Sequence, residues 1–374
     1  MKKNGSRISR RTFIKQASRI SGAACMMSAL PIPTVRKAFA SAAGKIKIGV
    51  IAPSHCALPV LDAYHNDIYK KNGIDAEIVY KPDMPDIAAG LMGGELQVGQ
   101  LISPVFFAMN AGSGPFKGKA TPLVTAQVAG TNGGVLVVAN YSTIKSPKDL
   151  KGKKIGVHSP LMVHNLLINT LLIRHKINPA TDITIKIISM KNLIPALKSG
   201  EIDAFINPEP LGTFAKSNGV ARELMITKKL WFKHPCCIVS VRRDLYEKDP
   251  DLVQAVYKSS IESGLMLNNV KTRNAHIEKI HKDSKLYSQF PAGAMKKAFM
   301  PGRSDFDPFP YQSSGKAVLT MIKEFKMMPA SAKADEMVSQ AFLSDVSRKL
   351  IASAGGKPPA KNTRIEKIVG KVVS

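Results

Sequence analysis

The sequence predicts an α/β protein with two lobes, each built on a mainly parallel sheet. From residue 45 one pattern recurs: a short β-branched apolar run, a break with proline or serine, and a stretch of helical periodicity. This alternation is typical of βαβ units, whose strands pair in parallel. The pattern stops near residue 140 and then begins again. A chain of 374 residues is also long enough for two domains.

The first block supplies most of the first lobe. Strands are expected at 46–51, 76–80 and 96–101, and helices at 58–72, 85–92 and 105–110. Glycines follow the first two of these helices, as is common at helix ends. The apolar run 135–138 is expected to be a buried strand that crosses to the second lobe.

The second block repeats this order and is followed by a helical region. Strands are expected at 154–158, 183–188 and 204–207, and helices at 161–176, 193–198 and 212–218. The run 237–241 is expected to cross back, and helices at 250–268, 274–282, 292–299, 314–325 and 334–347 to return to the first lobe. The resulting domains are lobe I (41–138 plus 242–350), lobe II (139–241) and a basic flexible tail (351–374).

The N-terminus carries a twin-arginine export motif. Residues 9–15 read SRRTFIK, a short apolar stretch follows, and Ala38-Phe39-Ala40 fits the A-x-A cleavage rule. We therefore expect a signal peptide over 1–40, export by the twin-arginine machinery, and a periplasmic or extracytoplasmic location. The apolar stretch is far shorter than the roughly 20 residues of a membrane span.

The charge of the chain argues against a nucleic-acid partner. Removal of the signal, with its nine basic residues and no acid, lowers the formal charge from +27 to +18. Nucleic-acid binding favours basic residues clustered on one element among aromatics, whereas here the lysines are spread along the chain. We expect a monomer whose basic surface raises the local concentration of anions.

Three cysteines remain after Cys25 is removed with the signal: Cys56, Cys236 and Cys237. An odd number cannot form a complete disulfide framework. One interpretation is burial of Cys236-Cys237 in the crossing strand. The alternative is a soft-metal or thiol-reactive site, built from these cysteines with His55 and His234.

Prolines mark five junctions between strands and helices, at Pro59, Pro85, Pro104, Pro160 and Pro210. In open α/β sheets such junctions lie at the carboxyl ends of the strands, where ligands bind and exposed helix amides favour negative groups. Three junctions belong to the first block and two to the second. We expect them to face each other across a cleft between the lobes.

Two segments of the second block resemble the solute-binding proteins of ABC importers. Residues 149–157 read DLKGKKIGV, and 196–204 read ALKSGEIDA and are followed by Glu209-Pro210. The resemblance is to the group that carries nitrate, bicarbonate, aliphatic sulfonates and taurine. It implies a type II periplasmic-binding-protein fold with two hinge crossings, which closes on one small solute and presents it to a membrane permease. It implies no reaction and no cofactor.

Shorter segments lean toward the nitrate and bicarbonate branch, at 54–57, 164–166 and 231–235. Where that branch carries a tryptophan this chain has Met84, and its glutamine near the first crossing is replaced around 132–134. We therefore expect a small polar or anionic solute other than nitrate. The candidate ligand-binding residues are His55, Cys56, Met84, Gln100, Ser103, Asn132, Gly133, His164, Glu209 and Lys233.

The same fold serves in yeast-type pyrimidine synthases of thiamine biosynthesis, which carry a cysteine-rich run near the second crossing. Cys236-Cys237 is similar to that run, so an enzyme of this type is the alternative function. The sequence shows no Ser/His/Asp arrangement and no HExxH, CxxC or phosphate-loop motif. We expect a binding protein without catalytic residues or a metal cofactor.

Overall fold

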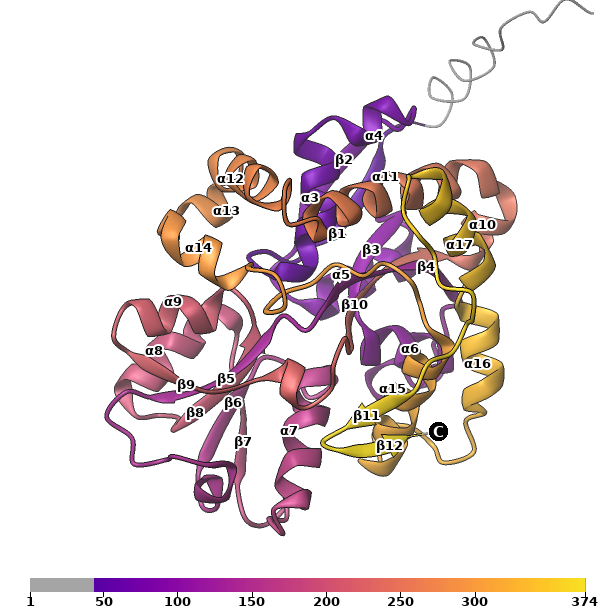
Figure 1. Cartoon of the computed structure of the whole chain (residues 1–374). Helices are drawn as coiled ribbons and strands as arrows, with labels where there is room; N and C mark the ends of the chain where they lie inside the picture. The colour runs from indigo at the N-terminus through magenta and orange to yellow at the C-terminus, as the bar shows by residue number, and fades with distance from the viewer. Residues whose placement is uncertain (1–43, 374) are drawn as a thin grey trace, which may run out of the picture.

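The computed structural model describes residues 44–373 and shows two α/β lobes (Figure 1). The signal predicted at 1–40 lies outside the described residues. Each lobe contains a five-stranded sheet, in the order β2-β1-β3-β10-β4 in lobe I and β7-β6-β8-β5-β9 in lobe II. The strands of lobe I are β1 (Ile46–Val50), β2 (Ala76–Tyr80), β3 (Val98–Ile102), β4 (Leu123–Thr131) and β10 (Pro235–Arg242). Those of lobe II are β5 (Gly134–Ala139), β6 (Lys154–Val157), β7 (Thr184–Ile187), β8 (Ala204–Pro208) and β9 (Ala221–Ile226).

In each sheet, the strand that enters from the other lobe pairs antiparallel with both neighbours. β10 pairs in this way with β3 and β4, and β5 with β8 and β9. The chain therefore changes sheet at 132–133 and again within 227–234. The boundaries expected at 138/139 and 241/242 differ from this, because β5 belongs to lobe II and β10 to lobe I. The apolar runs 135–138 and 237–241 predict central buried strands, but an apolar run does not indicate which sheet the strand joins.

Two strands of the five-stranded sheets were not expected from the sequence. β4 reads LVTAQVAGT and is buried along its whole length, but its alanines and glycine dilute the β-branched pattern. β9 reads ARELMI and is half-buried at most positions. Each of these strands leads into a crossing, so that both crossings are anchored at their start by a sheet.

The helices follow the expected order with altered bounds. The region expected as one helix at 58–72 is divided into α3 and α4 near Asp67, whose backbone is left-handed with φ of 55°. Helices before the second crossing are α3 (Leu58–His65), α4 (Ile68–Lys71), α5 (Met84–Gly93), α6 (Ser103–Ala111), α7 (Val163–Arg174), α8 (Leu193–Ser199) and α9 (Leu211–Ser217). Those after it are α10 (Arg243–Lys248), α11 (Pro250–Asn268), α12 (Arg273–Asp283), α13 (Lys285–Ser288), α14 (Ala292–Ala298), α15 (Gln312–Glu324), α16 (Ala334–Ala341) and α17 (Ser344–Ser353). Short 3-10 helices are η1 (His55–Ala57), η2 (Gly114–Phe116), η3 (Pro147–Leu150), η4 (Met190–Asn192) and η5 (Thr227–Lys229). None of the described helices is long and apolar enough to cross a membrane.

The sequence predicted a proline at the start of five helices, and three of them have it in the first turn. Pro59, Pro85 and Pro104 lie in the first turn of α3, α5 and α6, where a missing N–H costs nothing. Pro160 precedes α7 by three residues, and Pro210 is the residue that caps α9. The first-lobe junctions are therefore regular helix starts, while in the second lobe residues 158–162 separate β6 from α7.

The two lobes share one continuous apolar core. It includes the buried faces of β1, β3, β4 and β10, and it continues into α7 and β6 of lobe II. A second cluster covers the other face of the lobe II sheet. Phe214 on α9 and Phe290 before α14 also meet edge to face across the lobes, with ring centroids 4.9 Å apart. The lobes are thus in close contact rather than separated by an open groove.

The expectation of a flexible tail at 351–374 is wrong for the described part. After α17 the chain forms a hairpin, β11 (Glu366–Ile368) with β12 (Lys371–Val373), beside α7 and α15 (Figure 1). Glu366 is 1% exposed and accepts hydrogen bonds from Trp231 Nε1 (2.7 Å) and Ser314 Oγ (2.6 Å). The Gly/Pro/Lys composition predicted a loop. It did not reveal that the Glu366 carboxylate and a backbone hydrogen bond from Val369 to the carbonyl of Leu230 (2.6 Å) tie this segment to the second crossing.

Candidate functional site at the lobe junction

Two glycines of the first crossing allow imidazoles from both lobes to approach it. His55 on η1 comes from lobe I and His164 on α7 from lobe II, and both are fully buried. A Cβ built on Gly133 would overlap the ring of His55, and one built on Gly134 would overlap the ring of His164. The crossing therefore lies between two histidine side chains that only glycine can accommodate.

Asn132 fastens the two crossings to each other. Its backbone is left-handed, with φ of 65°, and its side chain is buried. Asn132 Oδ1 accepts a hydrogen bond from the N–H of Lys233 (2.6 Å), and Nδ2 donates to Asp305 Oδ2 (2.8 Å). The Lys233 side chain itself forms an ion pair with Asp307 (2.8 Å). Lys233 is thus at the second crossing, as the sequence placed it, but its charge is already paired.

His164 and His234 form a pair of buried imidazoles. Their ring centroids are 5.7 Å apart, in an edge-to-face arrangement. Among the described residues, neither nitrogen of His164 has a hydrogen-bond partner, nor does Nδ1 of His234. His234 Nε2 lies 2.9 Å from the hydroxyl of Thr227, which in turn donates to the carbonyl of Asn132 (2.7 Å). Buried nitrogens without a partner carry a free-energy cost that a bound ligand would relieve.

The imidazoles at the junction are neutral at physiological pH. Burial, together with the nearby His234, lowers the pKa of His55 to about 3. Burial likewise lowers the pKa of His234 to about 3, with Arg364 as a second cause. The pKa of His164 lies well below its usual value, because of burial and then the neighbouring imidazoles. The junction is therefore polar but offers no histidine charge to a ligand.

Sulfur atoms lie beside this group. An imidazole nitrogen of His55 and the sulfurs of Cys56 and Cys236 are all within 4.8 Å of one another, and all three residues are buried. Burial raises the pKa of both thiols well above the usual value. Gln100 lines the same region, with Nε2 at 3.6 Å from Cys237 Sγ and Oε1 accepting from the N–H of Ile51 (3.3 Å). Of the five residues considered for a soft-metal site, the structure brings these three together.

Glu209 is buried at the end of β8 and is occupied by protein partners. Its carboxylate accepts from Arg303 Nε (2.6 Å) and from the hydroxyl of Thr213 (2.8 Å). Burial raises its pKa, while Arg303 opposes that shift. The Glu209 carbonyl also accepts a hydrogen bond from the N–H of His55 (2.8 Å). Glu209 therefore joins the lobes at the edge of the junction.

Two candidate residues lie in packed surroundings. Met84 at the start of α5 is 4% exposed and belongs to the lobe I core. Ser103 is fully buried, and its hydroxyl donates to the carbonyl of Pro235 (2.7 Å). In the structure both side chains support the lobe I side of the junction rather than adding an unpaired polar group to it.

Sequence reasoning missed Arg303 and Thr227. Arg303 lies in the segment after α14 and reaches both Glu209 and Glu223 of lobe II. Thr227 begins η5 and bonds to the first crossing. Neither residue belongs to a local motif. Arg303 follows Pro301-Gly302, a dipeptide typical of turns, but many surface residues share such a position.

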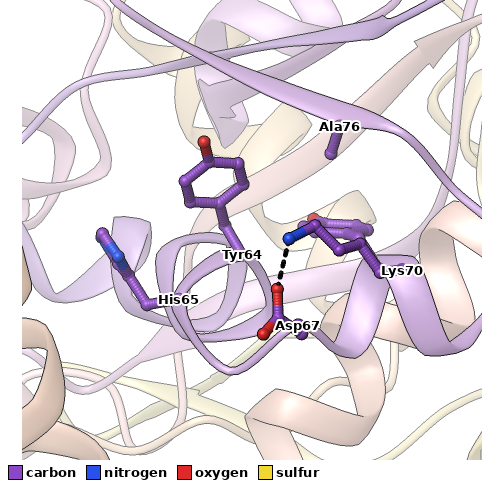
Figure 2. A pocket seen from close by; sticks show the side chains of 6 residues that line it. Tyr64, His65, Asp67, Lys70 and Ala76 are labelled. Atoms are coloured by element: carbon purple, nitrogen blue, oxygen red, sulfur yellow. Dashed lines mark ion pairs between the residues drawn. The ribbon is translucent and has the colours of Figure 1, made fainter.

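A separate cavity of about 200 Å³ lies on lobe I, at the turn between α3 and α4 and next to β2 (Figure 2). It is lined by Tyr64, His65, Asp67, Tyr69, Lys70 and Ala76. The Lys70–Asp67 ion pair at its rim spans 2.7 Å, and both side chains are more than half exposed. This cavity has no residue in common with the lobe junction.

Two five-stranded α/β lobes, joined by two crossings that enclose buried polar groups, define the class of periplasmic-binding-protein folds of type II. Within this class, the pattern of the NMT1-like family matches residues 40–281, more than half of the chain. The chain therefore belongs to the NMT1-like family. The expected fold class is confirmed.

Comparison with individual proteins gives the same picture. The nitrate/nitrite binding protein NrtA of Nostoc sp. is 23% identical over 360 residues, which cover 86% of this chain and 80% of NrtA. The bicarbonate transport ATP-binding protein CmpC of Synechocystis sp. is 25% identical over 231 residues, 58% of this chain but only 34% of CmpC. Among solved structures, the periplasmic nitrate-binding protein NrtA from Synechocystis PCC 6803 matches with a TM-score of 0.78 and 18% identity, over 87% of this chain and 94% of that one.

Proposed function

We propose that the protein is the extracytoplasmic solute-binding component of an ABC importer. The observation that carries this proposal is the junction itself, where His55 of lobe I and His164 of lobe II face the same glycine crossing and buried nitrogens lack partners. A solute that contacts both lobes binds the closed form better than the open one, which couples capture to closure. The relatives named as nitrate-binding and bicarbonate-transport proteins support this role.

The captured solute is small and polar and lies between the lobes. It is delivered to a membrane permease, and the twin-arginine motif at 9–15 directs export to the periplasm. Binding rather than catalysis is proposed, because the junction's imidazoles are neutral and lack a neighbouring nucleophile–base–carboxylate arrangement in the described part of the chain. The pyrimidine-synthase alternative has no specific geometric support.

A thermal-shift panel tests the proposal. The purified exported protein is heated with nitrate, bicarbonate, aliphatic sulfonates, thiamine-pyrimidine analogues and metal ions. A ligand at about 100 times its dissociation constant adds about 2.7 kcal/mol to stability, and several degrees to Tm.

His164→Ala should abolish the shift given by the active compound. His175→Ala is the matched control, because His175 ends the same helix and lies outside the junction. The proposal fails if no compound raises Tm, or if His164→Ala and His175→Ala respond to the active compound alike.

A further inference from the structure

Three side chains that bind metals in other proteins meet beside the lobe junction. His55, Cys56 and Cys236 present one nitrogen and two sulfurs within 4.8 Å of one another. Cys56 Sγ already lies 3.5 Å from His55 Nε2. In a tetrahedral zinc site, with Zn–S of about 2.3 Å and Zn–N of about 2.1 Å, neighbouring ligand atoms are roughly 3.6 Å apart. Small side-chain movements would therefore bring all three atoms onto one ion.

We propose that this cluster binds one thiophilic divalent cation, with Zn²⁺ as the reference ion, and that such a cation is the solute captured at the junction. This inference rests on the proposed function and specifies the chemical class of the solute that the protein would bind. Sulfur and imidazole donors suit zinc and its soft neighbours, whereas carboxylate oxygens, which magnesium and calcium prefer, are not part of the set.

Charge balance favours a cation over an anion here. Binding of Zn²⁺ replaces two thiol protons, so that Zn²⁺ and two Cys–SH give Zn(S–Cys)₂ and two H⁺. With a neutral imidazole the loaded site has no net charge, which a buried site tolerates. A bound anion would need a cation of its own. Yet Arg303, Lys233 and Arg364, the basic groups that the described structure places around the junction, are paired with carboxylates.

The origin of the ligands connects metal binding to closure. His55 and Cys56 lie on η1 and Cys236 begins β10, so lobe I alone supplies the three donors. Lobe II adds His164, packed on Gly134 next to the glycine that touches His55, with both nitrogens unpartnered among the described residues. The open protein would hold the ion through lobe I, and closure would bring the imidazole of His164 toward it.

Titration of the metal-free, reduced protein with Zn²⁺ by calorimetry tests this inference. We expect one ion per chain, and a Co²⁺-loaded sample should show a thiolate-to-cobalt absorption band. Cys56→Ser and Cys236→Ser should each weaken binding by a factor of about 10 to 100. His175→Gln is the control, because this histidine ends α7 outside the junction and its loss tests for adventitious binding to a histidine elsewhere. It should bind Zn²⁺ like the wild type.

Three results would overturn the inference: no Zn²⁺ binding, no thiolate band, or equal affinity in wild type, Cys56→Ser and Cys236→Ser, which would indicate surface histidines. The band is measured on wild-type protein, so it decides the question even if a cysteine variant does not fold. If an oxyanion from the thermal-shift panel binds through His164 while Zn²⁺ does not bind, this inference fails and the proposed function stands. If neither binds, the proposed function fails as well.

Discussion

Arg303 of lobe I holds the buried carboxylate of Glu209 in lobe II. Its Nε donates at 2.6 Å, its Nη2 lies 2.5 Å from the same oxygen, and its Nη1 lies 2.8 Å from Glu223. The arginine side chain is 17% exposed and the Glu209 side chain is fully buried. One side chain therefore links the helical region after the second crossing to Glu209, which follows β8, and to Glu223 on β9.

Arg303→Gln should open or destabilise the closed form. The substitution leaves Glu209 buried without its cation, and the loss of one partner of a buried pair costs about 3 to 5 kcal/mol. Equilibrium unfolding in denaturant measures the loss, and small-angle scattering measures any change in dimensions.

A double variant is the control for this ion pair. In Arg303→Gln with Glu209→Gln the uncompensated charge is gone, so part of the lost stability should return. If Arg303→Gln alone were as stable as the wild type, the pair would have no role in holding the lobes.

Gly133→Ala should displace the ring of His55 from the junction. The added Cβ overlaps that ring, and overpacking of this kind costs about 1 to 3 kcal/mol. Gly93→Ala is the matched control, because nothing lies within 4 Å of a Cβ at that position on α5. Ligand affinity and unfolding free energy should fall in the first variant only. Equal behaviour of the two variants would contradict the packing described here.

Trp231→Phe should loosen the contact between the C-terminal hairpin and the second crossing. The change keeps an aromatic ring but removes the N–H that donates to Glu366, a hydrogen bond to a buried carboxylate. Such bonds contribute about 1.5 to 3 kcal/mol. Hydrogen exchange at 366–373 should become faster, while Ile365→Ala, at a residue 75% exposed, should leave it unchanged. Unaltered exchange in Trp231→Phe would show that the hairpin is held by other contacts.

Stability should fall as the pH drops below 6.5. The pKa of His55 and of His234 is about 3 in the folded protein and about 6.5 when unfolded, so the neutral form is favoured by folding. Their contribution is complete above pH 6.5 and is lost as the pH falls toward 3, by up to about 1.4 kcal/mol per pH unit for each ring. Glu209, whose pKa is raised by burial, acts in the opposite sense because its ionised form is disfavoured.

Unfolding free energies at pH 7, 6 and 5 measure this slope. His234→Gln should give a flatter dependence than the wild type, and His175→Gln, outside the junction, should leave the slope unchanged. A pH-independent wild type would rule out neutral buried imidazoles.

The sequence predicted most of the strands and helices in their order. It also identified His55, Asn132 and Gly133 as candidate site residues, and the structure places them at the junction. These features depend on local periodicity and on turn residues. It could not predict the Arg303–Glu209 pair, whose partners are 94 residues apart and follow no pattern. Nor could it place β4, whose small residues pack well but carry no distinctive β signal. The burial of Glu366 also could not be predicted, because it depends on the packing of the hairpin against Trp231, 135 residues earlier in the chain.

β10 lies between β3 and β4, and these two strands pair with it rather than with each other. During synthesis the lobe I sheet cannot be completed until β10 has been made, and β10 follows all of lobe II in the chain. Residues 134–226, in contrast, contain every strand of the second sheet in one continuous stretch. We therefore expect amide hydrogens of lobe II to be protected from exchange early in folding, and those of the lobe I sheet to be protected last. The slow step of folding is then the long-range pairing of β10 with β3 and β4.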